Sequence, residues 1–130
     1  MRVFGVKPFA RFQRKEGMSD AVLRKAVREA EAGLIEADLG HGLIKLRVAR
    51  PGGGKRGGYR TIIAYRRRDR AVFLFGFAKN AKADLAPDEL EILVRRGAAR
   101  LTADEDLIEA AIMDERLMEL DDGTDDESDA

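Results

Sequence analysis

The chain has 130 residues, and its 24 Lys and Arg residues balance its 24 Asp and Glu residues, so the formal net charge is zero. The absence of cysteine excludes disulfides, thiolate catalysis and thiolate metal sites, and one histidine, His41, leaves little material for an imidazole metal site. No apolar run approaches the ~18 residues of a membrane-spanning helix, and residues 1–6 lack the features of a signal peptide. We expect a cytoplasmic α+β protein with no membrane partner and no cofactor, of a length that fits one core.

The zero net charge hides a separation of charge along the chain. Residues 1–82 contain 20 Lys and Arg against 7 Asp and Glu, a net charge of +13, whereas residues 83–130 contain 4 against 17, a net charge of −13. A basic body predicts a surface that binds a polyanion. The acidic last third could shield that surface or could simply make the protein more soluble.

The N-terminal part predicts a strand and a first helix. Residues 2–6 form a strand candidate, and Pro8 suits the first turn of a helix that places Phe9 and Phe12 on one side. Gly17 ends that helix.

A second helix follows, for which Ser19 is the predicted N-cap. Apolar residues recur at spacings of four, three and four and form one stripe, which comprises Leu23, Val27, Ala30 and Leu34. Asp38, Gly40 and Gly42 are typical of a loop before the sheet begins.

Three strand-like runs form the predicted sheet, at residues 43–49, 59–66 and 71–77. A cationic glycine-rich loop at 51–58 joins the first two, and a charged turn at 68–70 joins the last two. Connections this short make antiparallel neighbours. The third run is apolar on both faces, which predicts a central strand.

The remaining sequence is typical of helices. Pro87 suits a first turn, and Thr102 and Glu105 have the spacing of a capping box that opens a further short helix. The stripe of the longer helix comprises Leu90, Leu93, Val94 and Leu101. We therefore divide the chain into a domain at 1–101, a C-terminal helical extension at 102–120 and a disordered acidic tail at 121–130.

The glycine-rich loop does not fit a nucleotide-binding P-loop. Arg56 follows Lys55 where that motif requires Ser or Thr, and the next element reads as a strand rather than a helix. Two interpretations stay open: a flexible hairpin whose amides and cations approach a phosphate chain, or a solvated loop tip.

Cations gather in the sheet region. Between residues 42 and 80, Asp69 is the sole acidic residue, and the alternation of a strand places Lys45 and Arg47 together on one face. Such charge could serve solubility alone, but its concentration around one loop and one sheet edge favours binding to RNA phosphates. The predicted RNA-contacting set comprises Lys45, Arg47, Arg50, Lys55, Arg56, Tyr59, Arg60 and Lys79.

The same cluster could cleave RNA without a metal ion. The 2′-hydroxyl supplies the nucleophile, arginines stabilise the pentavalent phosphate, and a lysine among cations gives up its proton more readily than a lysine in water. We expect Lys45 to act as acid or base, with Arg47, Arg60 and Lys79 holding the scissile phosphate. Tyr59 could stack on a base or pack its own ring, and His41 reads as a loop residue.

The runs GLIKLRVA at 42–49, GKRGGYR at 54–60 and GFAKN at 76–80 resemble the HigB-like branch of the RelE/ParE superfamily of type II toxin–antitoxin systems. The resemblance covers residues 3–101. It implies a RelE-like fold, with two N-terminal helices packed on a small antiparallel sheet and C-terminal helices after it. It also implies a ribosome-dependent endoribonuclease (mRNA interferase) that cuts mRNA in the ribosomal A site. A cognate antitoxin, HigA-like with a helix-turn-helix, would neutralise it.

The resemblance also carries individual roles and leaves alternatives. Arg60 matches the phosphate-binding arginine of the family, Lys45 and Arg47 match its basic strand, and Lys79 falls near its second cationic position. No tyrosine stands at 83–85, where RelE has one, so the residue that moves the proton stays open. ParE-like proteins share the fold but inhibit DNA gyrase without cutting RNA, and an RNA-binding module without catalysis is a further alternative.

Overall fold

The computed structural model describes residues 1–50, 52, 58–82 and 84–122. The predictions for Lys55, for Arg56 and for residues 123–130 of the tail lie outside this described part. The elements in chain order are β1 (Arg2–Val6), α1 (Lys7–Glu16), α2 (Asp20–Glu31), β2 (Ala37–Gly40), β3 (Leu43–Val48), β4 (Tyr59–Arg66), β5 (Arg70–Ala78), α3 (Pro87–Thr102), α4 (Glu105–Met113) and β6 (Leu117–Glu119).

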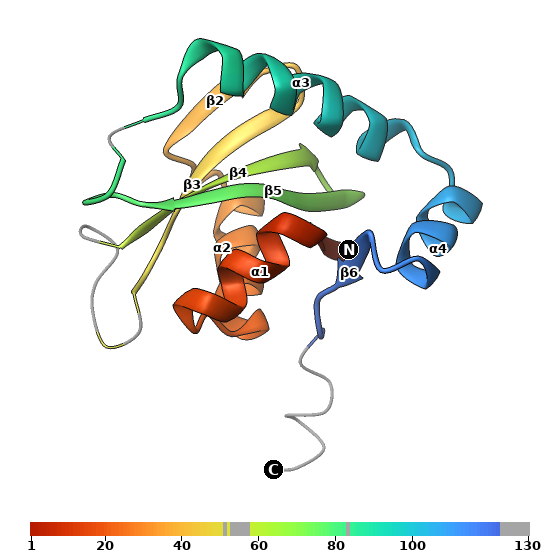
Figure 1. Cartoon of the computed structure of the whole chain (residues 1–130), viewed down its shortest axis with the longest axis horizontal. Coiled ribbons are helices and arrows are strands. Elements are labelled where there is room, and N and C mark those ends of the chain that lie inside the picture. The colour runs from red at the N-terminus through yellow and green to blue at the C-terminus, as the bar shows by residue number, and fades with distance from the viewer. Residues whose placement is uncertain (51, 53–57, 83, 123–130) are drawn as a thin grey trace.

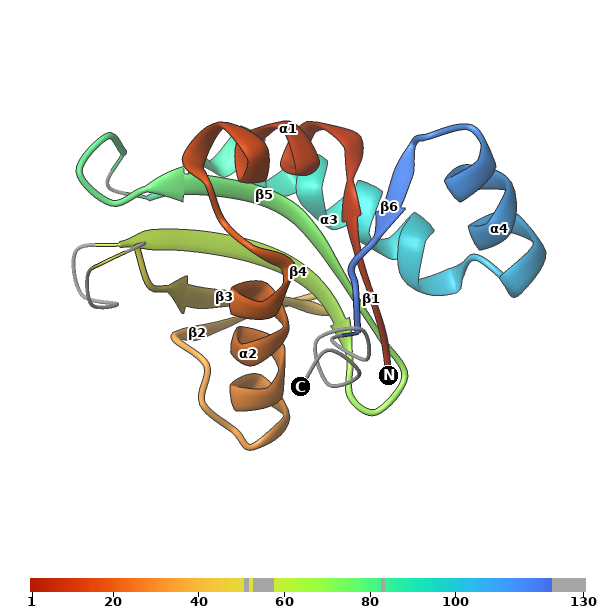
Figure 2. The same cartoon turned by 90° about the horizontal axis from the view of Figure 1, so that it is seen from below.

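The strands form one sheet in the order β2-β3-β4-β5-β1-β6. β2 to β5 pair with antiparallel neighbours, and β5 is an interior strand, as predicted. The small antiparallel sheet that the resemblance implies comprises β2 to β5, and the structure extends it, because β1 pairs in parallel with β5 and β6 then pairs antiparallel with β1. The sheet is therefore mixed, and the first and last strands of the chain lie side by side (Figure 2). The α+β class is confirmed.

Helices cover both faces of the sheet (Figure 1). On one face, α1 and α2 bury an apolar core in which the rings of Phe9 and Phe73 lie 5.0 Å apart. On the other face, α3 and α4 pack against a second core that includes Leu43 and Ile62. Gly97 brings α3 close to the sheet, since a Cβ atom there would lie 2.9 Å from a methyl carbon of Leu43. Both faces are buried, which explains the apolar character of the central strand.

The predicted starts of the first helices are confirmed, but one end is not. Val22 donates its N–H to the hydroxyl of Ser19 at 3.2 Å, and Gly17 ends α1 with a φ of 71°. α2 ends at Glu31, so Leu34 is outside the helix and 64% exposed rather than part of its apolar stripe. Gly33, with a φ of 93°, turns the chain before that residue can reach the core.

The C-terminal elements differ in detail from the prediction. Pro87 does begin α3, but Thr102 is its last residue and donates its hydroxyl to the carbonyl of Ala98 at 2.8 Å. Asp104 caps α4 by accepting the N–H of Leu107 at 2.9 Å, so the predicted capping box is wrong. β2 and β6 occupy segments in which no strand was predicted. No helix in the described ranges is long and apolar enough to cross a membrane.

Candidate functional site

β3 and β4 bring three of the predicted site residues onto one face of the sheet. Arg60 shares its face of β4 with Ile62, which belongs to the core under α3. The register places Arg47 opposite Arg60 and Lys45 opposite Ile62. Like charges directly opposite each other on neighbouring strands repel, so this arrangement requires a counterion.

Glu36 supplies that counterion. The Nε atoms of Arg47 and Arg60 each donate to its Oε1 atom at 3.0 Å, and Nζ of Lys45 lies 4.0 Å from its Oε2 atom. Glu36 immediately precedes β2, and its backbone N–H donates to the carbonyl of Lys45 at 2.9 Å. The sequence interpretation missed Glu36. A β2–β3 hairpin around His41 would have placed it beside the cations.

Asp84 is the second carboxylate of the site. Its Oδ1 atom lies 3.3 Å from Nζ of Lys45. A hydrogen bond from the N–H of Leu85 lowers the pKa of Asp84, and the charges of Lys45 and Lys79 lower it further. The four predicted catalytic residues therefore gather around two carboxylates, which leaves the cluster of Lys45, Arg47, Arg60, Lys79, Glu36 and Asp84 with a net charge of +2. We call this set the cation cluster.

The members of the cation cluster differ in exposure. The side chain of Arg60 is 5% exposed and therefore buried. The side chain of Arg47 is 49% exposed and lines a hollow of about 360 Å³ with Glu36. Lys45, 15% exposed, has carboxylates as well as cations beside it: its Nζ atom lies 3.3 Å from Asp84 and 4.0 Å from Glu36. Lys45 is therefore not surrounded by cations alone.

Comparison with known proteins decides the family. The model of the RelE toxin of RelE/RelB toxin–antitoxin systems matches residues 1–120. The chain belongs to the RelE toxin family. It is accordingly a toxin of a toxin–antitoxin system, from a family that generally inhibits translation and pairs with an antitoxin. A search of curated proteins finds no match.

Two residues at the edge of the site of this RelE toxin pack against each other. The ring of Tyr59 is buried and lies edge-on to Phe12 at 5.8 Å, and the guanidinium of Arg50 lies 5.8 Å from its centre. The hydroxyl of Tyr59 donates to Glu16 at 3.0 Å. Burial is the main cause that raises the pKa of Tyr59. Of the two alternatives for this tyrosine, the geometry fits ring packing.

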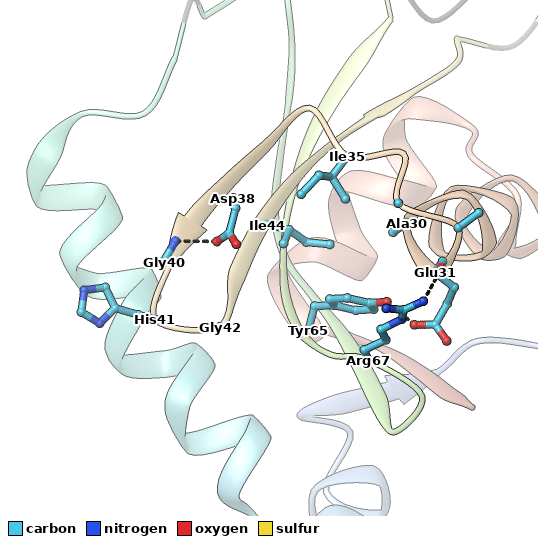
Figure 3. A pocket seen from close by; sticks show the side chains of 12 residues that line it. Ala30, Glu31, Ile35, Asp38, Gly40, His41, Gly42, Ile44, Tyr65 and Arg67 are labelled. Carbon is cyan, nitrogen blue, oxygen red and sulfur yellow. Dashed lines mark hydrogen bonds between the residues drawn. The ribbon is translucent and has the colours of Figure 1, made fainter.

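A larger hollow of this RelE toxin, about 590 Å³, lies between α2 and the β2–β3 hairpin (Figure 3). Its wall includes Tyr65, which donates its hydroxyl to the carboxylate of Glu31. His41 sits at the hairpin turn with a φ of 55° and points away from that pair, in keeping with its interpretation as a loop residue. The hollow contains none of the cation cluster. Within the described residues, no group of three or more acidic or histidine side chains is placed to hold a metal ion.

Proposed function

We propose that this toxin is a ribosome-dependent endoribonuclease of the HigB-like branch, which cleaves mRNA in the cytoplasm by metal-free attack of a 2′-hydroxyl. The observation that supports the proposal is the convergence of Lys45, Arg47 and Arg60 on one face of the sheet. Cations held at fixed positions suit a phosphate that gains negative charge during the reaction. The cognate antitoxin that we propose is HigA-like, with a helix-turn-helix.

Each of the four cations of the cation cluster has a role in the proposed reaction. The 2′-oxygen attacks the adjacent phosphorus and gives its proton to a water molecule, while the bond from phosphorus to the 5′ oxygen breaks and that oxygen receives a proton from Lys45. The products are a 2′,3′-cyclic phosphate and a 5′-hydroxyl. Arg47, Arg60 and Lys79 hold the scissile phosphate and stabilise the equatorial oxygens of its pentavalent form.

Lys45 suits the role of general acid. Its Nζ atom lies 4.0 Å from Glu36 and 3.3 Å from Asp84, and an ammonium group can give a proton to the leaving 5′ oxygen. A lysine placed among cations alone would suit proton removal instead. Of the two proton-transfer roles that the sequence left open for this residue, we therefore propose proton donation.

The proposed function is tested by expressing the toxin and mapping mRNA 5′ ends, in cells and on purified ribosomes programmed with one message. We expect new 5′-hydroxyl ends inside codons, and no cutting of the same message without ribosomes. Intact mRNA together with induction of the SOS response would instead support ParE-like inhibition of gyrase. Intact mRNA without that response would leave an RNA-binding toxin that does not cut.

The variant Arg47→Ala tests the role of the cluster directly. Arg47 is half-exposed, so its loss should affect the transition state more than folding. We expect cleavage to slow roughly 10- to 100-fold, the effect of losing one charge-assisted hydrogen bond to the phosphate. The matched control is Arg95→Ala, since Arg95 is an exposed residue of α3 that pairs with Glu91. An Arg47→Ala toxin that cleaves as fast as the control would remove Arg47 from the site.

A further inference from the structure

Glu36 is the least expected residue of the cation cluster. Its side chain is 18% exposed, and its Oε2 atom is buried without a hydrogen-bond partner among the described residues. A buried carboxylate oxygen without a partner is costly and calls for an explanation. The ammonium of Lys45 lies 4.0 Å from this Oε2 atom, which is too far for a hydrogen bond.

The contacts of Glu36 leave the two arginines in a particular orientation. Its Oε1 atom accepts from the Nε atom of both Arg47 and Arg60. A guanidinium that uses Nε on one side still has amino groups for other acceptors, and Nη1 of Arg60 donates to the carbonyl of Tyr59 at 3.4 Å. One carboxylate therefore fixes the planes of two guanidiniums that would otherwise repel each other across the strand pair.

We propose that Glu36 is a positioning residue for RNA cleavage, which holds Arg47 and Arg60 in the geometry that the pentavalent phosphate requires. This inference rests on the proposed function of the same site. Glu36 does not contact the reacting atoms, because its Oε2 atom is sealed from solvent and its Oε1 atom is already shared by two donors. It differs in this from a general base, which must reach the 2′-hydroxyl.

The role has a consequence that can be measured, because Glu36 also repels the substrate. With Glu36 ionised the cation cluster has a net charge of +2, and its removal would raise that charge to +3. Binding of RNA in the ground state should therefore improve when Glu36 is neutralised, while the transition state loses its aligned arginines. Affinity and rate should move in opposite directions, as expected when an interaction serves the transition state rather than the substrate.

A counterion that serves stability alone makes a different prediction. Removing one partner of a buried ion pair destabilises the fold, and a partly unfolded protein would lose binding and cleavage together. The two roles are therefore separated by the sign of the change in affinity. They also differ at a temperature where the variant is fully folded: a positioning role predicts slow cleavage there, whereas a purely stabilising role predicts the wild-type rate.

The decisive variant is Glu36→Gln, which keeps the size and the acceptor oxygen but removes the charge. Affinity is measured with a single-stranded oligoribonucleotide that carries a 2′-deoxy sugar at the cleavage position, between 50 and 200 mM KCl. Rate is measured as single-turnover cleavage on programmed ribosomes. We expect binding about 2- to 5-fold tighter, a salt dependence steeper by about 0.7 in log–log slope, and cleavage at least 10-fold slower.

Two further variants control the experiment. Glu91→Gln changes the net charge equally but lies on the exposed side of α3, and we expect it to alter neither quantity. Glu36→Asp keeps the charge with a shorter reach, so it should bind RNA like the wild type and recover part of the rate. It also keeps the test informative if the glutamine variant folds poorly in a thermal melt.

Three results would overturn the inference. Cleavage by Glu36→Gln at the wild-type rate would show that the arginines need no positioning. Weaker binding and slower cleavage in proportion to the unfolded fraction would show a stabilising counterion alone. Wild-type toxin that leaves mRNA intact on ribosomes would overturn the proposed function itself, and this failure is recognised because it occurs without any substitution.

Discussion

Tyr65 is held in its neutral form by the residues around it. Burial raises the pKa of Tyr65 to about 12 from an ordinary value of 10.0, and the hydrogen bond that its hydroxyl donates to Glu31 adds to the effect. The same bond is the main cause that lowers the pKa of Glu31. The hydrogen bond between Tyr65 and Glu31 thus joins β4 to the end of α2, beside the hollow of about 590 Å³.

The raised pKa makes a prediction for alkaline pH. The folded state holds the Tyr65 proton more tightly than the unfolded state, so the contribution to stability is complete below pH 10.0 and is lost as pH rises towards 12. Urea denaturation of wild type and Tyr65→Phe at a series of pH values measures this. We expect the difference in free energy of unfolding to shrink across that window. A difference independent of pH would contradict the linkage.

The positions of the cations could be predicted from the sequence, whereas those of their counterions could not. Strand alternation correctly grouped Lys45 with Arg47 on one face of β3. The same alternation along β4 puts Arg60 on the face of Ile62. Glu36 was not predicted as a counterion because Asp38 and Gly40 are typical of a loop. In the structure they belong to β2, the edge strand that pairs with β3. Asp84 lies between β5 and α3, outside any helix or strand. Such contacts depend on tertiary placement, which periodicity does not encode.

At the scale of elements, α3 approaches the sheet closely at one point. A Cβ atom at Gly97 would lie 2.9 Å from Leu43, 3.2 Å from Leu74 and 3.3 Å from Ala64. The neighbouring Ala98 is exposed on the outer side of the same helix. The two positions therefore form a natural pair for separating packing from helix propensity.

We predict that Gly97→Val destabilises the protein by about 1–3 kcal/mol, because a branched side chain overpacks this contact. Ala98→Val should cost roughly 0.5 kcal/mol, the loss of helix propensity alone. Urea denaturation of both variants gives the comparison. Equal effects at the two positions would mean that the sheet and α3 can separate at no cost, contrary to the geometry.

The elements that could be predicted are those with enough residues to show a period. The helices at α1, α2 and α3 and the strands β3 to β5 follow from apolar spacing, N-caps and first-turn prolines. β6 has three residues and β2 has four, too few for alternation to stand out. Each forms by pairing with the edge of a neighbouring strand: β6 pairs with β1, and β2 pairs with β3.

At the scale of the whole molecule, Arg2 joins β1 to the late elements α4 and β6. Nε of Arg2 donates to Glu119 at 2.8 Å, and its two amino groups lie 2.8 Å from Glu105 and 2.9 Å from Glu109. Arg70 reinforces the same corner by donating to the carbonyl of Ala103 at 2.8 Å. These contacts hold α4 and β6 against the start of β1.

We predict that Arg2→Ala lowers the free energy of unfolding by about 1–2 kcal/mol at pH 7, more than an isolated surface pair contributes. The hydrogen bond from Arg2 is the main cause that lowers the pKa of Glu119, so the effect should be present above pH 4.5 and fade as pH falls through the lowered value. Denaturation at pH 7 and pH 3 measures this, with Arg95→Ala as the exposed control. An effect of equal size at both pH values would exclude the carboxylates as its source.

The adjacency of β1 and β6 also sets the order in which the molecule can be completed during its own synthesis. β1 is synthesised before the other elements, but one of its two neighbouring strands, and all three carboxylates that hold Arg2, lie within residues 105–119. That edge of the sheet therefore stays unpaired in a nascent chain until residues 105–119 have been synthesised. The sheet and the Arg2 contacts are therefore completed only after the helices α1 to α4 have been made.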